Sequence, residues 1–84
     1  MIKFTTTIGF EEGLHARPAS ELVKVCQKAK SDIKIIKGTV KVNPKSILGI
    51  LTLGAAHNDS ITIEVTGEDE VLISENLKTF FKSE

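Results

Sequence analysis

The sequence predicts an α+β fold in which three helices cover one face of a four-stranded antiparallel sheet. Apolar residues alternate with a period of two in some segments and follow helical spacing in others, in the order strand, helix, strand, strand, helix, strand, helix. The first and fourth predicted strands alternate apolar with polar residues, which is typical of an antiparallel sheet with one face in water. The 84 residues suffice for one modest core, so we expect a single domain over residues 1–84.

The first strand is predicted at residues 2–8, where apolar and β-branched residues alternate with polar ones. A helix follows to about residue 29. Pro18 cannot donate a backbone hydrogen bond and fits only the first turn of a helix, so this helix begins close to Ala16. Its expected buried stripe consists of Ala19, Leu22, Val23 and Cys26.

A β-hairpin is predicted next, with strands at residues 33–36 and 39–42 and a turn at Lys37-Gly38. Asn43-Pro44 ends its second strand, because proline cannot continue the ladder of hydrogen bonds.

The fourth strand is predicted at residues 60–66 and ends at Gly67. A final helix follows, and the acidic residues at its start are expected to interact with its dipole rather than to form a catalytic pair. These acids are Glu68, Asp69 and Glu70. The expected apolar stripe of this helix consists of Val71, Ile73, Leu77, Phe80 and Phe81.

A short helix is predicted between Ser46 and Gly54, since serine is a favoured N-cap and glycine often ends a helix. One face of so short a helix can bury Ile50 and Leu53. The other apolar side chains cannot all point inward: Ile47, Leu48 and Leu51. Either these three residues form an exposed docking patch, or the whole helix is buried in the hydrophobic core.

Composition argues against several classes of function. The 11 basic residues balance the 11 acidic ones, and tryptophan and tyrosine are absent, so we do not expect nucleic-acid binding. The single cysteine, Cys26, excludes an internal disulfide. His57 lies among turn residues without partners at metal-ligand spacing, so a solvated loop residue and no metal are expected. Because no signal peptide or membrane-spanning run is seen, we expect a cytoplasmic protein without membrane contact.

His15 is the candidate functional residue, within Gly13-Leu14-His15-Ala16-Arg17-Pro18-Ala19. Backbone N–H groups at the start of a helix lack helical acceptors and favour an anion such as phosphate. Arg17 adds a planar, permanently charged group suited to phosphate oxygens. Neutral imidazole is a nucleophile, so the pattern predicts attack of His15 on phosphorus. The alternative is that His15 only caps the helix and Arg17 is a solvated charge.

The topology also predicts that the helix N-termini gather at one end, with His15 near Ser46.

With these residues, the sequence resembles the HPr family, the histidine-containing phosphocarriers of the bacterial phosphoenolpyruvate-dependent sugar phosphotransferase system, in its Gram-positive type. The resemblance covers essentially the whole chain. It rests on the segment around His15 and on Lys45-Ser46-Ile47-Leu48-Gly49, which is similar to the family's regulatory serine segment. It implies an open-faced β-sandwich with the order βαββαβα.

The resemblance implies that His15 accepts a phosphoryl group from phosphorylated enzyme I and passes it to the sugar-specific enzyme II A domains. In the family the group is carried on Nδ1. Arg17 would neutralise the phosphoryl group in transit. Such a protein is a stoichiometric carrier in sugar uptake rather than an enzyme, and it needs no cofactor.

The resemblance further implies that an ATP-dependent HPr kinase/phosphorylase modifies Ser46. The serine-phosphorylated form would bind a catabolite-control repressor and so take part in carbon catabolite control. A monomer is expected, because a carrier presents one face to several partners in turn. The implied docking residues are Ile47, Leu48, Leu51, Ser20 and Lys24.

The chain departs from the family pattern at two places. Pro44 is unexpected just before the regulatory segment and stiffens its approach. Leu48 and Leu51 stand where the Gram-positive type often has methionines, which adapt more readily to partners. Two other functions compete with the phosphocarrier: an HPr-like regulatory protein acting only through phosphoserine, and a small binding domain without phosphoryl chemistry. Intact His15 and Arg17 argue against the regulatory relative, because known relatives of that kind lack the histidine.

Overall fold

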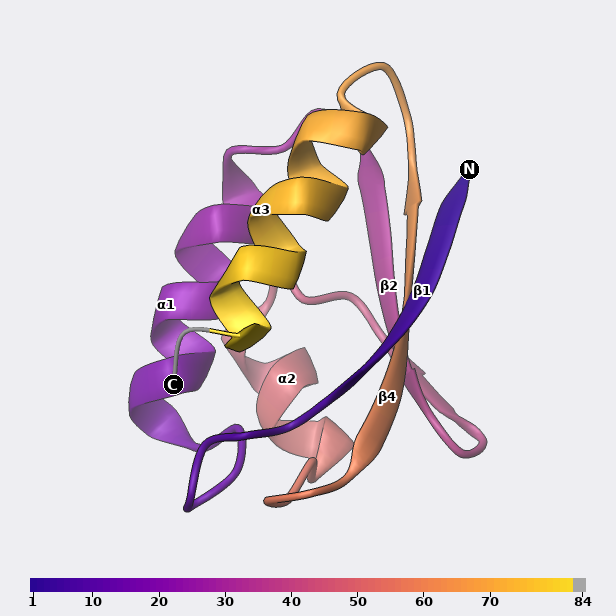
Figure 1. Ribbon diagram of the computed structural model, residues 1–84. Coiled ribbons are helices and arrows are strands. Elements are labelled where there is room, and N and C mark those ends of the chain that lie inside the picture. The colour runs from indigo at the N-terminus through magenta and orange to yellow at the C-terminus, as the bar shows by residue number, and fades with distance from the viewer. Residues whose placement is uncertain (83–84) are drawn as a thin grey trace.

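The computed structural model describes residues 1–82, and its elements follow the predicted order. The strands are β1 (Ile2–Thr7), β2 (Asp32–Lys37), β3 (Val40–Val42) and β4 (Ser60–Thr66). The helices are α1 (Ala16–Gln27), α2 (Ile47–Leu53) and α3 (Glu70–Lys82). Figure 1 shows the helices together on one side of the sheet. The predicted α+β class is confirmed, and the architecture is an open-faced β-sandwich.

The sheet has the strand order β1-β4-β2-β3, and all of its pairs are antiparallel. β4 therefore lies inside the sheet although it is the last strand in the sequence. It pairs with the whole length of β1, from Thr7↔Ser60 to Ile2↔Val65. Its alternation places every second residue in the core, as the sequence predicts: Ile61, Ile63 and Val65 are buried.

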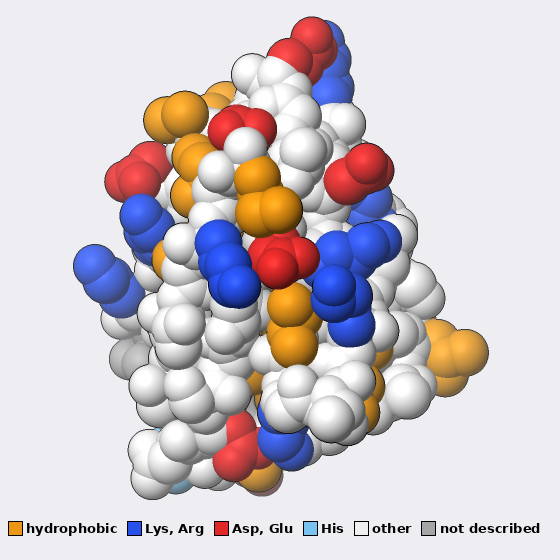
Figure 2. Space-filling model, turned by 90° about the vertical axis from the view of Figure 1, so that its right-hand side faces the viewer, with side chains coloured by type: hydrophobic (Ala, Val, Ile, Leu, Met, Phe, Trp, Pro, Cys, Tyr) orange, Lys and Arg blue, Asp and Glu red, His pale blue; other side chains and the backbone are white. Residues whose placement is uncertain are grey.

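The opposite face of the sheet is open and carries charged side chains. Glu64 of β4 forms ion pairs with Lys3 of β1 and Lys41 of β3, with nitrogen–oxygen distances of 3.9 and 3.8 Å. Figure 2 shows this face, on which basic side chains surround a central acidic one. Charged residues on an exposed sheet face keep it in water, so the helices cover only the other face.

The turn between β2 and β3 lies one residue later than predicted. Lys37 pairs with Val40, so Gly38 and Thr39 form the turn, and Lys37 belongs to the strand. Gly38 has a φ of 60°, which glycine adopts without steric cost and which two-residue hairpin turns require.

The core lies between the helices and the sheet. α1 buries Pro18 in addition to the predicted Ala19, Leu22 and Cys26, and Val23 is half-buried. The predicted apolar face of α1 is therefore confirmed. No helix within residues 1–82 is long and apolar enough to cross a membrane.

The predicted stripe of α3 is wrong at Val71, which is 65% exposed. The buried face runs through Ile73, Leu77 and Phe81, at four-residue spacing. Val71 lies two positions before Ile73, about 200° around the helix axis, and therefore faces solvent. The position of an apolar residue around the helix axis, and not its nearness in the sequence, decides whether it is buried.

Asp69 has a larger structural role than the predicted interaction with the helix dipole. Its carboxylate accepts hydrogen bonds from the backbone N–H groups of Lys30 and Ser31, each at 2.9 Å, and from the Ser31 hydroxyl. Glu70 accepts a hydrogen bond from the N–H of Gly67 at 3.0 Å. Asp69 thus ties the start of α3 to the connection between α1 and β2.

Candidate functional site

His15 is the N-cap residue of α1, as predicted. Its backbone is extended, and its carbonyl accepts the first hydrogen bond of the helix, from the N–H of Ala19 at 2.9 Å. Pro18 has no N–H to offer. The N–H groups of Ala16 and Arg17 have no hydrogen-bond acceptor within residues 1–82. The helix therefore begins with two free donors beside the histidine, at the positive end of its dipole.

The loop before His15 is fixed by the segment that follows α2. The N–H of Leu14 donates to the Ala55 carbonyl at 2.9 Å, and the Leu14 side chain is buried. Gly13 has a φ of 77°, and a Cβ atom there would lie 2.5 Å from the Ala55 oxygen. Gly13 is thus needed both for the turn that the sequence indicates and for close packing against a second segment.

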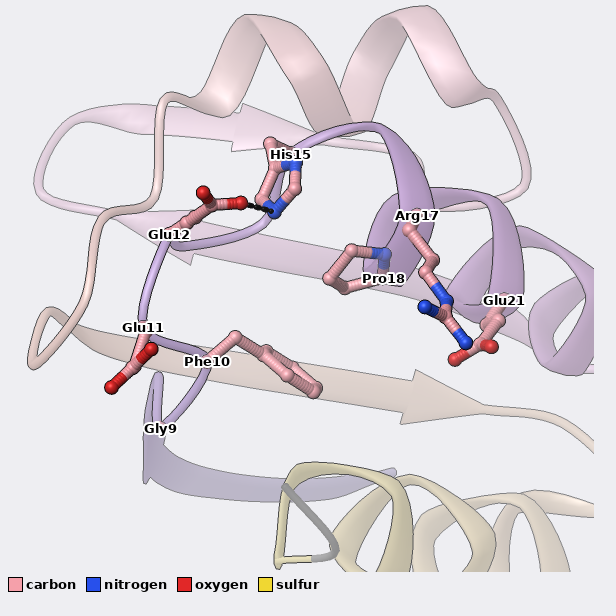
Figure 3. A pocket seen from close by; sticks show the side chains of 8 residues that line it. All are labelled: Gly9, Phe10, Glu11, Glu12, His15, Arg17, Pro18 and Glu21. Carbon is pink, nitrogen blue, oxygen red and sulfur yellow. Dashed lines mark ion pairs between the residues drawn. The ribbon is translucent and has the colours of Figure 1, made fainter.

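The imidazole of His15 is accessible, with 46% of the side chain exposed. Its Nε2 atom lies 3.0 Å from the Oε2 atom of Glu12, a contact drawn as a dashed line in Figure 3. No role for Glu12 is predicted from the sequence. The sequence holds one signal for this contact, because Glu12 is a carboxylate three residues before the histidine and is separated from it only by Gly13 and Leu14.

Arg17 lies near His15, and both side chains line one open hollow. Figure 3 shows the Arg17 side chain extending along α1 toward Glu21 and away from the imidazole. A change of rotamer is therefore needed before its guanidinium can meet a group on His15. The residues that line the hollow are Gly9, Phe10, Glu11, Glu12, His15, Arg17, Pro18 and Glu21.

Ser46 is the N-cap of α2, and its Oγ accepts a hydrogen bond from the N–H of Gly49 at 3.3 Å. Gly54 ends the helix with a φ of 66°. Both ends of α2 are as predicted. Pro44, the unexpected residue before this segment, is fully buried, so it packs into the core instead of projecting toward partners.

The prediction that His15 lies near Ser46 is wrong, because α2 runs antiparallel to α1. Gln27 at the end of α1 donates to the carbonyl of Lys45 at 3.1 Å, whereas Leu14 contacts Ala55 beyond the end of α2. The hairpin explains this orientation: two antiparallel strands, β2 and β3, lie between the helices, so the chain returns to the end of the sheet where α1 ends and enters α2 there. In Figure 1, α2 accordingly ends near the start of α1.

The apolar residues of α2 divide between the core and the surface. Ile50 and Leu53 are buried, whereas Ile47, Leu48 and Leu51 are 41%, 70% and 45% exposed. The alternative that the whole helix is buried in the core is therefore wrong. The three exposed residues form a surface that we call the α2 patch.

The remaining candidate residues are on the surface. Ser20 and Lys24, one turn apart on α1, are exposed. His57 is exposed in the loop after α2. Across residues 1–82 there is no group of three or more histidine, cysteine or acidic side chains arranged to hold a metal ion.

The chain and its structure match known proteins over nearly their whole length. Residues 2–83 match the family model described as "PTS HPr component phosphorylation site". The phosphocarrier protein HPr of Mycoplasma genitalium is 45% identical over 71 residues, which cover 83% of this chain and 81% of that protein.

Two solved structures share the fold. The crystal structure of HPr-C-His from Thermoanaerobacter tengcongensis has a TM-score of 0.96 and 36% identity, covering 99% of this chain and 93% of that one. The crystal structure of Crh from Bacillus subtilis, described as a catabolite repression protein that forms a swapped dimer, has a TM-score of 0.77 and 32% identity. It covers 98% of this chain and 94% of that one.

The open-faced sandwich, the accessible histidine at its first helix and these matches define the class of protein: a phosphocarrier of the phosphotransferase system. Within that class, the chain belongs to the HPr family.

Proposed function

We propose that His15 accepts a phosphoryl group from phosphorylated enzyme I and transfers it to enzyme II A domains during sugar uptake. One observation carries this proposal: an accessible imidazole stands at the start of α1 beside the free N–H groups of Ala16 and Arg17. The protein would act as a stoichiometric carrier in the cytoplasm, not as an enzyme, and as one HPr-like domain spanning residues 1–84.

The geometry supports this chemistry in two ways. The free N–H groups and the helix dipole, about half a positive charge, stabilise a phosphoryl group attached to the neighbouring ring. Arg17, which lines the same hollow, supplies a charged planar group that reaches phosphate oxygens after a rotamer change. The site is open, so the imidazole can enter the active sites of its donor and its acceptor in turn.

Incubation with phosphoenolpyruvate, magnesium and a bacterial enzyme I tests the proposal. Intact mass is measured at neutral pH and after mild acid treatment, with a known HPr as the positive control. We expect one phosphate adduct that acid removes and that His15→Ala abolishes. If the control is labelled and this protein, correctly folded, is not, the carrier function is excluded.

We further propose that the α2 patch, with Ser20 and Lys24, docks enzyme I and the enzyme II A domains. Its apolar residues are exposed next to Ser46, whose hydroxyl is accessible at the N-cap of α2. An HPr kinase/phosphorylase would phosphorylate Ser46, and the modified protein would bind a catabolite-control repressor. The added charge, about −1.5 to −2, would sit beside the patch and repel an acidic partner.

The position of Ser46 at the opposite end of α1 from His15 predicts how this regulation acts. Because the phosphoserine does not touch the imidazole, Ser46→Asp should raise the KM of enzyme I for this protein and change kcat little. Ser46→Ala serves as the uncharged control. A fall in kcat at unchanged KM would show that the charge acts on the chemistry instead of on docking.

A second candidate function is an HPr-like regulatory protein that acts only through phosphoserine, and the likeness to Crh favours considering it. It predicts phosphate on Ser46 from ATP and a kinase, and none on His15 from phosphoenolpyruvate and enzyme I. The labelling experiment therefore separates the two. We also propose a monomer, which light scattering after gel filtration tests; a stable dimer would contradict it.

A further inference from the structure

We propose that Glu12 is a positioning residue for His15: its carboxylate holds the imidazole in the Nε2–H tautomer and leaves Nδ1 free to take the phosphoryl group. This inference rests on the proposed carrier function. It gives a role to a side chain that lies outside α1 and outside the α2 patch.

The contact itself fixes which nitrogen carries the proton. The Oε2 atom of Glu12 lies 3.0 Å from the Nε2 atom of His15. An ionised carboxylate only accepts hydrogen bonds, so the nitrogen that faces it must donate. In a neutral imidazole the other nitrogen, Nδ1, then holds the lone pair. Figure 3 shows this second nitrogen turned away from Glu12.

The backbone holds Glu12 in place although its side chain is exposed. The N–H of Gly13 donates to the Phe10 carbonyl at 2.9 Å and closes a tight turn that contains Glu12. Directly after this turn, Leu14 is buried and hydrogen-bonded to Ala55. The carboxylate and the imidazole therefore project from one short anchored segment, the turn and the N-cap residue of α1 that follows it.

The arrangement suits both directions of transfer. In the forward step the lone pair of Nδ1 attacks phosphorus, and the donor's bond to phosphorus breaks with its electron pair staying on the donor. The proton on Nε2 remains in place, so the product ring is an N-phosphoryl imidazolium whose positive charge faces Glu12. In the onward step the acceptor's nucleophile bonds to phosphorus, and the bond from phosphorus to Nδ1 breaks with its electron pair returning to Nδ1. The ring thus leaves as neutral imidazole, still protonated at Nε2. Glu12 thus keeps the imidazole protonated at Nε2 through both steps, without itself receiving or giving up a proton.

The tautomer is measured first, on the unphosphorylated protein, by ¹⁵N NMR of the ring nitrogens at a pH where both histidines are neutral. His57, exposed in a loop, is the internal reference. We expect a larger Nε2–H fraction at His15 than at His57. Glu12→Ala should bring His15 to the value of His57, a change of about fivefold or less in the tautomer ratio, because the contact is exposed to water.

Two further variants make this test specific. Glu12→Gln should keep part of the difference, because its side-chain oxygen still accepts a hydrogen bond. Glu11→Ala removes the same charge from the same hollow but has no contact with His15 within residues 1–82, and it should behave as wild type. Equal tautomer ratios in wild type, Glu12→Ala and Glu11→Ala would overturn the proposal.

The rate of phosphorylation by phosphorylated enzyme I is the second readout. We expect Glu12→Ala to be slower than wild type by up to about fivefold, Glu12→Gln to lie between them, and Glu11→Ala to match wild type. An unchanged or faster rate in Glu12→Ala overturns the positioning role. If wild type accepts no phosphate, the proposed carrier function fails instead, and the NMR comparison still reports on the pair.

Discussion

At the scale of the residue, the hydroxyl of Ser74 is buried without a hydrogen bond to offset the loss of contact with water. The residue is 1% exposed, and its Oγ atom has no hydrogen-bond partner within residues 1–82. Burying a hydroxyl without a hydrogen bond costs free energy, and alanine is also the better helix former. We expect Ser74→Ala to raise the free energy of unfolding by about 1 kcal/mol. Urea denaturation checks this, and a lower midpoint would show that the hydroxyl is satisfied in solution.

Cys26 is the only cysteine, and its environment makes it unreactive. Burial raises the pKa of its thiol to about 12, although the ammonium group of Lys45 acts in the opposite direction. The thiolate, which is the reactive form, is therefore nearly absent in the folded protein at about pH 8. We expect iodoacetamide to alkylate Cys26 at a rate limited by the unfolding that exposes the thiol. Rapid alkylation of the native protein, compared with a sample in denaturant, would contradict this.

At the scale of the element, Asp69 predicts how stability depends on pH. Hydrogen bonds from the Ser31 hydroxyl and the Lys30 N–H lower its pKa from 3.8. A carboxyl with a lower pKa in the folded state stabilises the fold above its unfolded pKa, and this stabilisation is lost as the pH falls through the folded pKa. We expect Asp69→Asn to lower the Tm at neutral pH.

The pH series supplies the control for this substitution. The Tm difference between wild type and Asp69→Asn should begin to shrink below about pH 4, where the carboxyl of the unfolded chain becomes protonated, and should shrink further as the pH falls through the lower pKa of the folded state. A difference that stays constant down to about pH 2 would mean that the charge of Asp69 contributes nothing and that the substitution acts through shape.

The turn before α1 gives a second prediction at this scale. Gly13→Ala puts a methyl group against the carbonyl of Ala55 and forces a side chain into a left-handed backbone. We expect a loss of about 1–3 kcal/mol in the free energy of unfolding. Gly54 also has a positive φ, but among residues 1–82 the nearest atom to its Cβ position is a carbonyl oxygen at 4.0 Å. Gly54→Ala is therefore the matched control and should cost less. Equal losses of unfolding free energy in the two variants would show that the backbone at Ala55 moves aside without an energetic penalty.

The elements were largely predictable from local signals, whereas contacts between them were not. β4 has the predicted bounds, and α2 lies between the predicted cap Ser46 and the predicted stop Gly54, because alternation and capping are local properties. The antiparallel arrangement of α1 and α2 was missed, since it depends on how the hairpin turns the chain. The contact of Glu12 with His15 was not predicted for a related reason: the spacing of three residues permits it, but only the fold of the turn brings the two side chains together.

At the scale of the whole molecule, the sheet depends on its last strand. Within residues 1–82, β1 pairs only with β4, and β2 has β4 on one side and the short β3 on the other. We expect a chain that ends at residue 59 to lack the native sheet, as shown by poor dispersion of its amide NMR signals. A chain ending at residue 69, which keeps β4, should retain more strand signal by circular dichroism. Native-like dispersion in the shorter chain would show that β4 is dispensable.

The same strand order sets the timing of folding during synthesis. The ribosome releases residues in sequence, at about 5–20 per second, and β1 is the first strand to emerge. Its partner lies nearly sixty positions later, since Thr5 is opposite Thr62. The first strand therefore stays unpaired until residues 60–66 of the 84 have been made. Translation of this chain can build α1, the hairpin of β2 and β3, and α2 before β4 is made, but the sheet is completed only when β4 joins β1 to β2.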